Sequence, residues 1–157
     1  MTTASTPSSD FGDRTMRPGA KRYEGTDITV SYESRICLHQ AECLRGLPTV
    51  FDVEHRPWID VGAASAAAIA DVIERCPSGA LQYHMSSERD MSSERDEEPQ
   101  QPTRLRRDSN GILHIRGDLL IDTPAGVRHE TRVMLCGCAQ SGNKPFCDHS
   151  GTCGRAA

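Results

Sequence analysis

The stretch CGCAQSGNKPFCDHSG, residues 136–151, decides how the C-terminal part of this chain folds. It places Cys136, Cys138 and Cys147 within a dozen residues of one another. Thiolates are soft ligands that suit iron–sulfur clusters, Zn²⁺ or Cu⁺. Gly137 lets the backbone bend tightly between the first two cysteines. The turn-forming Ser-Gly-Asn-Lys-Pro segment then reverses the chain direction and brings the third cysteine close to them. The stretch therefore predicts a metal site built on a tight loop.

The spacing in this stretch resembles that of the CDGSH iron–sulfur domains, the mitoNEET-like proteins. The pattern C-x-C-x2-[ST]-x3-P-x-C-D is matched at every fixed position, namely Cys136, Cys138, Ser141, Pro145, Cys147 and Asp148. The resemblance covers about residues 105–154. It implies a [2Fe–2S] cluster in which Cys136 and Cys138 hold one iron, while Cys147 shares the other iron with a histidine.

The sequence departs from this family at the fourth ligand. The family has its histidine four residues after the last cysteine, where this chain has Gly151. Glycine has no side chain, so either His149 binds iron from a shifted position or Cys153 takes its place; we favour His149. A histidine ligand removes negative charge from the site and raises the reduction potential, as in Rieske centres, whereas Cys153 predicts a lower potential.

A second group of cysteines lies in the N-terminal half. Cys37 and Cys43 are close in sequence, and Cys76-Pro77 follows later. Bacterial ferredoxins use C-x2-C-x2-C and a remote cysteine followed by proline. Here Gln40 stands at the middle position. Three thiolates suit a [3Fe–4S] cluster, or a [4Fe–4S] cluster with a non-cysteine fourth ligand, for which His39 is the nearest candidate.

The sequence around these cysteines resembles the divergent single-cluster ferredoxin-like domains assigned to [4Fe–4S] binding. The resemblance covers about residues 22–84 and rests on the segments 47–51, 56–59 and 76–81. An alternative is that the three thiols are buried and act as small hydrophobic residues.

Composition along the chain predicts four segments. Residues 1–21 are rich in Ser, Thr, Pro and Gly and predict a disordered tail. Residues 85–104 begin with MSSERD repeated in tandem and predict a linker, because a hexapeptide repeat without apolar content cannot pack. These segments leave one module at 22–84 and another at 105–154.

Periodicity predicts a small α+β fold. Apolar residues alternate with polar ones over residues 28–32, as in a half-buried strand. A helix ending before Pro77 presents one apolar face, made of Ile69, Val72, Ile73 and Cys76. Turn signals at 110–111 and 124–126 separate short apolar runs in the second module. We therefore expect a small ferredoxin-like α+β domain followed by a small β-rich CDGSH-type domain.

Composition also limits the class of protein. The 157 residues are 36% hydrophobic and only 4% aromatic, so two small domains with thin cores are expected to depend on metal or disulfides. The N-terminus shows no apolar signal segment, and no stretch approaches the roughly 18 apolar residues of a membrane span, so we expect a cytoplasmic protein with reduced thiols. Seven cysteines, an odd number, also fit a disulfide framework poorly.

These observations predict an iron–sulfur protein of electron transfer or redox sensing rather than an enzyme. No nucleophilic triad, phosphate-binding loop or paired-carboxylate pattern stands out. The expected partner is a redox protein, and the CDGSH resemblance allows for a homodimer. A net charge of -4 argues against nucleic acid, and no membrane partner is expected. The alternatives are a zinc-binding structural or interaction module and a factor for iron–sulfur cluster assembly or repair.

Overall fold

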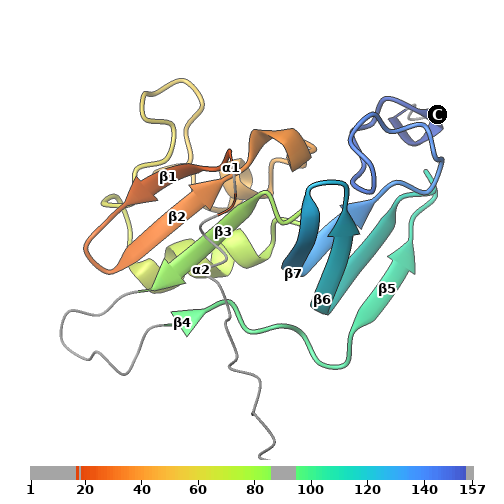
Figure 1. Ribbon diagram of the computed structural model, residues 1–157. Helices are drawn as coiled ribbons and strands as arrows, with labels where there is room; N and C mark the ends of the chain where they lie inside the picture. The colour runs from red at the N-terminus through yellow and green to blue at the C-terminus, as the bar shows by residue number, and fades with distance from the viewer. Residues whose placement is uncertain (1–16, 18, 86–94, 155–157) are drawn as a thin grey trace, which may run out of the picture.

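The computed structural model describes Arg17, residues 19–85 and residues 95–154, and Figure 1 shows how their elements are arranged. Most of the predicted disordered tail and most of the MSSERD repeat lie outside the described residues. Across the described part of the chain, no helix combines the length and the apolar character needed to cross a membrane.

The N-terminal half contains an antiparallel sheet in the order β1-β2-β3-β4. Its strands are β1 (Lys21–Glu24), β2 (Ile28–Tyr32), β3 (Leu81–Met85) and β4 (Arg95–Asp96). The strand predicted over 28–32 is confirmed, with Ile28 and Val30 buried. Val30 lies opposite Tyr23 of β1 and Tyr83 of β3, and such aromatic and β-branched pairs stabilise a sheet.

Two α-helices accompany this sheet, α1 (Glu42–Gly46) and α2 (Ala66–Glu74). The side chain of Ser65 accepts a hydrogen bond from the backbone N–H of Ala68 and so caps the start of α2. The predicted apolar face is confirmed, because Ile69, Val72 and Ile73 are all buried. The helix ends just before Cys76, which is also buried, so the end of α2 fixes where this thiol lies.

The C-terminal half is β-rich, as predicted. Its antiparallel sheet has the order β5-β6-β7, formed by β5 (Arg104–Arg107), β6 (Leu113–Thr123) and β7 (Gly126–Leu135). The expected turn at Asn110-Gly111 joins β5 to β6, and Gly111 adopts a φ of 87° there, which favours glycine. β7 ends directly before Cys136, so the sheet delivers the cysteine loop from its last strand.

One apolar core runs through both halves of the molecule. Leu119, Val133 and Phe146 are buried in the same cluster of side chains as Ile73 and Leu81 of the N-terminal half. Burial of apolar surface shared by two small sheets stabilises both, at roughly 25 cal/mol per Å². The two halves are therefore packed against each other.

The structure differs from the predicted linker at 85–104. Met85 belongs to β3, and β4 pairs with β3 within the segment predicted to be unable to pack. The physical reason is an ion pair, because Glu97 is only 7% exposed and its carboxylate binds the guanidinium of Arg132. At the other end, Arg17 of the predicted tail is also buried and pairs with Glu130.

Candidate metal centres

The C-terminal cysteine loop is closed by backbone hydrogen bonds at its base. Leu135 forms an antiparallel bridge with Phe146. The N–H of Cys136 donates to the carbonyl oxygen of Pro145 at 2.9 Å, and the N–H of Cys147 donates to that of Met134 at 3.0 Å. These bonds hold the start and the end of the loop side by side, so cysteines eleven positions apart in sequence meet at one site.

The other fixed positions of the motif shape the loop. The hydroxyl of Ser141 donates to the carbonyl oxygen of Phe146 at 2.7 Å and accepts from the N–H of Asn143 at 3.0 Å. The carboxylate of Asp148 accepts from the N–H groups of Gly142 and Ser150, each at 2.9 Å. Ser141 and Asp148 therefore act on the backbone of the loop rather than as ligands.

Four sulfur atoms meet in this loop. The Sγ atoms of Cys136 and Cys138 lie 3.6 Å apart, those of Cys138 and Cys153 lie 3.5 Å apart, and those of Cys153 and Cys147 lie 3.4 Å apart. Cys147 and Cys153 are buried, whereas Cys136 and Cys138 are half-buried. The structure thus gathers the three predicted cysteines together with Cys153, the alternative fourth ligand, which the short helix Thr152–Gly154 brings into contact with them.

His149 and Gly151 occupy two different environments beside these sulfurs. His149 adopts a φ of 59°, in the left-handed region, and its Nε2 is buried with no hydrogen-bond partner among the described residues. A Cβ atom on Gly151 would lie 2.5 Å from the sulfur of Cys138 and 2.6 Å from the Cβ of Gln140. The space at position 151, where the CDGSH pattern has its histidine, is therefore already filled.

The loop favours a thiolate at Cys138. Backbone N–H groups of Gln140 and Cys153 donate to its sulfur and lower the pKa of this thiol to about 6. Burial instead raises the pKa of Cys153 to about 12, aided by the neighbouring sulfurs of Cys147 and Cys138. One thiol is thus ready to bind metal at neutral pH, whereas Cys153 gives up its proton when a cation compensates the negative charge.

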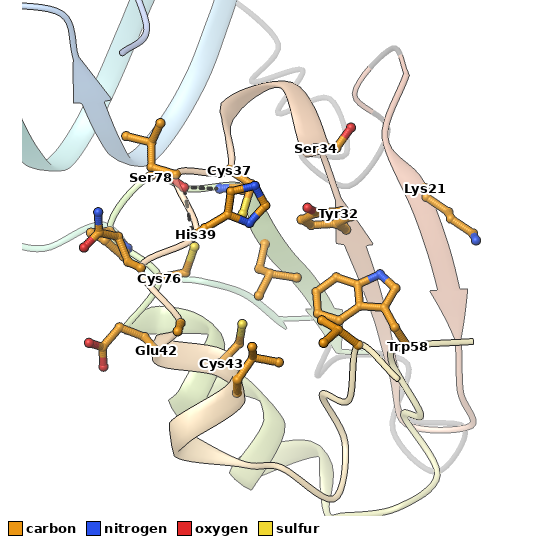
Figure 2. Close-up of a pocket in the computed structure, with 18 of the residues that line it drawn as sticks. Lys21, Tyr32, Ser34, Cys37, His39, Glu42, Cys43, Trp58, Cys76 and Ser78 are labelled. Atoms are coloured by element: carbon orange, nitrogen blue, oxygen red, sulfur yellow. Dashed lines mark hydrogen bonds between the residues drawn. The ribbon is translucent and has the colours of Figure 1, made fainter. Parts of the chain in front are cut away.

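The three N-terminal cysteines line one cavity of about 430 Å³, shown in Figure 2. Cys37 and Cys43 reach it from the loop before α1 and from α1 itself, and Cys76 reaches it from the end of α2. His39, the predicted fourth-ligand candidate, and Gln40 also line this cavity. The residues predicted from sequence are therefore brought together here.

Electrostatics in this cavity favour binding of a cation. Burial, together with the neighbouring Cys76 and Cys37, raises the pKa of Cys43 to about 11. Burial also raises the pKa of Tyr32, whose hydroxyl is hydrogen-bonded to Cys37. Clustered thiols that hold each other neutral become thiolates when iron supplies the compensating positive charge, so this donor set fits an iron–sulfur cluster.

Comparison with known proteins finds a family match over each of the two groups of cysteines. Residues 23–86 match the family described as "Divergent 4Fe-4S mono-cluster", and residues 110–150 match the family described as "Iron-binding zinc finger CDGSH type". A protein of Escherichia coli strain K12, described as "Uncharacterized protein YjdI", is 38% identical over 65 residues, which cover 41% of this chain and 86% of the relative. The protein of the same description from Escherichia coli O157:H7 matches equally well. No solved structure matches the chain.

The chain belongs to the divergent 4Fe-4S mono-cluster family and has a CDGSH domain C-terminal to the divergent 4Fe-4S domain. It is therefore an iron–sulfur protein. The divergent 4Fe-4S domain holds Cys37, Cys43 and Cys76, and the CDGSH domain holds Cys136, Cys138 and Cys147.

Two features of the sites were not predicted from the sequence as such. Leu38 is buried in a cluster with Ile112, Met134, Cys147 and Cys153, so the residue after Cys37 packs against the CDGSH domain. Arg132 binds the carbonyl oxygen of Cys76 from that domain. Arg132 directly precedes the apolar residues Val-Met-Leu at the end of its strand. An arginine in such an apolar segment is rarely buried unless it is paired, so this position indicates a buried ion pair.

Proposed function

We propose that this protein is a non-enzymatic electron carrier or redox sensor with a [2Fe–2S] cluster in the CDGSH domain and a [4Fe–4S] cluster in the divergent 4Fe-4S domain. The observation that carries the proposal is the contact of four sulfur atoms in the C-terminal loop. Such clusters supply one-electron chemistry at potentials set by their ligands and surroundings.

The four sulfurs support an assignment of iron ligands in two pairs. Cys136 and Cys138 would hold one iron, with their sulfurs 3.6 Å apart, and Cys147 and Cys153 would hold the other, with sulfurs 3.4 Å apart. Two thiolates on one tetrahedral metal at about 2.3 Å lie roughly 3.7 Å from each other, close to both separations. The sulfur of Cys138 lies equally close to that of Cys153, at 3.5 Å, so the distances support Cys153 as a ligand, while the pairing of Cys136 with Cys138 follows the CDGSH pattern.

His149 then takes a different part in the site. Its buried Nε2 has no hydrogen-bond partner in the described part of the chain, so it is available to a group that binds there. A histidine N–H beside cluster sulfur donates a hydrogen bond and tunes the reduction potential. In this proposal His149 supports the cluster and does not bind iron.

In the N-terminal domain, three thiolates would bind three irons of a cubane cluster. His39 lines the same cavity and is the proposed ligand of the fourth iron. If His39 does not bind, the same three cysteines would suit a [3Fe–4S] cluster. The cavity is lined by the proposed ligands themselves, so the proposal assigns no enzymatic step, and a separate redox protein supplies or accepts the electron.

A zinc-binding module is the second candidate, because the family that residues 110–150 match is described as an iron-binding zinc finger. Tetrahedral zinc needs at least three protein ligands around one point. Within the ranges 19–85 and 95–154, no three His, Cys, Asp or Glu side chains are arranged to hold a single metal ion. A [2Fe–2S] cluster needs only two protein thiolates at each iron, so this finding favours the cluster over zinc.

Anaerobic purification tests the proposal directly. We expect a coloured protein with iron and acid-labile sulfide in similar amounts, and two distinct EPR signals over the oxidised and reduced states. Cys136→Ser is expected to abolish one signal and Cys76→Ser the other. A colourless folded protein with about one zinc and no sulfide would refute the proposal and favour the zinc module.

A further inference from the structure

Arg132 connects the CDGSH domain to the segment that carries Cys76. It lies in β7, and its side chain is only 1% exposed. Its Nη1 donates to the carbonyl oxygens of Ile73, at 2.7 Å, and of Cys76, and its Nη2 donates to that of Leu81 at 3.0 Å. One guanidinium therefore binds the backbone on both sides of the turn at residues 76–81.

Glu97 completes the environment of this guanidinium. Its carboxylate accepts from Nε of Arg132 at 2.8 Å and from Nη2 at 2.6 Å. With the three carbonyl oxygens, these contacts occupy the five N–H donors of an arginine. A buried charge is tolerated when it is paired and fully hydrogen-bonded, so the orientation of Arg132 is fixed by its partners.

The turn itself is shaped to fit against β7. Gly79 adopts a φ of 71°, and a Cβ atom there would lie 2.3 Å from the carbonyl oxygen of Arg132. The carbonyl oxygen of Gly79 also accepts from Nη1 of Arg17 at 2.8 Å. Within the turn, the hydroxyl of Ser78 lies 3.6 Å from the sulfur of Cys76. The conformation next to this thiol thus depends on the neighbouring domain.

We infer that Arg132 of the CDGSH domain is a positioning residue for the cluster of the divergent 4Fe-4S domain. By binding the carbonyl oxygens around the turn, it keeps the thiol of Cys76 at the wall of the cavity in Figure 2. This inference rests on the proposed function. The E. coli relative is matched over 86% of its length by 65 residues, which leaves no room for a second domain of this kind, so the contact is a feature of this chain rather than of the whole family.

The test compares full-length proteins purified anaerobically, with iron retention against a chelator and EPR as readouts. In the double variant Arg132→Met/Glu97→Met both members of the ion pair are removed together, so neither is left as an unpaired buried charge. Partners that orient a metal ligand typically contribute about 10–100-fold in metal affinity. We expect a loss of this size in iron retention at the N-terminal cluster, while the EPR signal of the C-terminal cluster stays.

Two conservative variants separate positioning from mere packing. Arg132→Lys keeps the charge but cannot bind three carbonyl oxygens in a fixed fork. We expect it to retain the N-terminal cluster with an altered EPR line shape and a shifted midpoint potential. Arg128→Met is the matched control, because Arg128 also lies in β7 and pairs with Glu33 of the other half without contacting the Cys76 turn; its N-terminal EPR signal should match that of the wild type.

The outcomes distinguish this inference from the proposed function. If the wild-type protein lacks an N-terminal EPR signal, the proposed function fails before any variant is made. If it has both signals and the double variant keeps an unchanged N-terminal signal and chelator resistance, Arg132 has no positioning role. If the double variant fails to fold, Arg132→Lys and Gly79→Ala test the positioning role instead. An unchanged N-terminal EPR signal in both of these variants would also overturn the inference.

Discussion

The carbonyl oxygen of Gly111 lies directly against the backbone of Gly137, at the point where a side chain of residue 137 would begin. A Cβ atom on Gly137 would lie only 1.7 Å from that oxygen. The turn between β5 and β6 thus supports the Cys136–Cys138 bend from outside. The sequence predicts Gly137 for its flexibility, and the structure adds close packing as a second reason.

Gly137→Ala should therefore disrupt the C-terminal cluster. The added methyl group would overlap the carbonyl oxygen of Gly111, so the Cys136–Cys138 bend and its two thiols must move away from the turn between β5 and β6. We expect loss of the C-terminal EPR signal and of the corresponding iron. Gly142→Ala is the control in the same loop, because its nearest neighbour, an oxygen of Asp148, would be at an ordinary 3.4 Å. Equal iron content in both variants would contradict this account.

The fourth ligand of the C-terminal cluster can be decided by two substitutions. Cys153→Ala removes a sulfur that contacts those of both Cys138 and Cys147, and we expect it to abolish the [2Fe–2S] signal. His149→Ala should leave a cluster with a shifted midpoint potential, since only a hydrogen bond is lost. EPR of the reduced proteins measures both effects. If His149→Ala abolished the signal while Cys153→Ala kept it, the ligand assignment would have to be reversed.

Local features of this fold could be predicted from the sequence. The alternation over 28–32 and the apolar face of α2 each predict which side chains are buried from residues that are close in sequence, and both predictions are confirmed. The CDGSH pattern likewise lies within one loop, because its serine, proline and aspartate shape the same few backbone hydrogen bonds. Patterns that involve only residues close in sequence can be recognised from the sequence alone.

Contacts between distant segments could not be predicted in the same way. Glu97 stands in a polar segment that reads as a linker, and only its pairing with Arg132, 35 residues later, explains why it is buried. Arg132 in turn binds the carbonyl oxygen of Cys76, 56 residues earlier. No periodicity marks such pairs, because each depends on how two domains are docked. The dependence of the first site on the second domain is therefore visible only in the structure.

The stability of the turn that supports Gly137 should depend on pH through Asp108. Burial acts to raise the pKa of this carboxyl, but hydrogen bonds from His114 and from the N–H groups of Ile112 and Asn110 outweigh it and hold the pKa below its ordinary value. A lowered pKa in the folded state means that the stabilisation is present above the ordinary pKa and is lost as the pH falls through the folded-state value.

We expect Asp108→Ala to lower the free energy of unfolding by about 1.5–3 kcal/mol at pH 7, the usual contribution of hydrogen bonds to a charged group. At pH 3 the difference from the wild type should be smaller, because the wild-type carboxyl begins to protonate. Chemical denaturation at both pH values measures this, and comparing proteins at the same pH cancels the common effect of acid on the clusters. A difference that stays equally large at pH 3 would rule out the role of the ionised carboxyl.

Leu38 should couple the stability of the two cluster sites. It follows Cys37 and is buried with Ile112, Met134, Cys147 and Cys153 of the CDGSH domain. Leu38→Ala leaves a cavity in this cluster and is expected to lower the free energy of unfolding by about 2–5 kcal/mol. We also expect both clusters to lose iron to a chelator faster than in the wild type, because the gap lies between their ligand loops.

Leu105→Ala is the matched control, since Leu105 in β5 is 64% exposed and its truncation should change the free energy of unfolding by no more than about 0.5 kcal/mol. Leu38→Met, which conserves volume, should restore most of the stability, with a cost below about 1.5 kcal/mol. Following the loss of each EPR signal during denaturation measures the stability of each cluster site separately. If Leu38→Ala accelerated iron loss from the N-terminal cluster alone, Leu38 would belong only to the loop of Cys37, and the packing of the two sites against each other would not govern their stability.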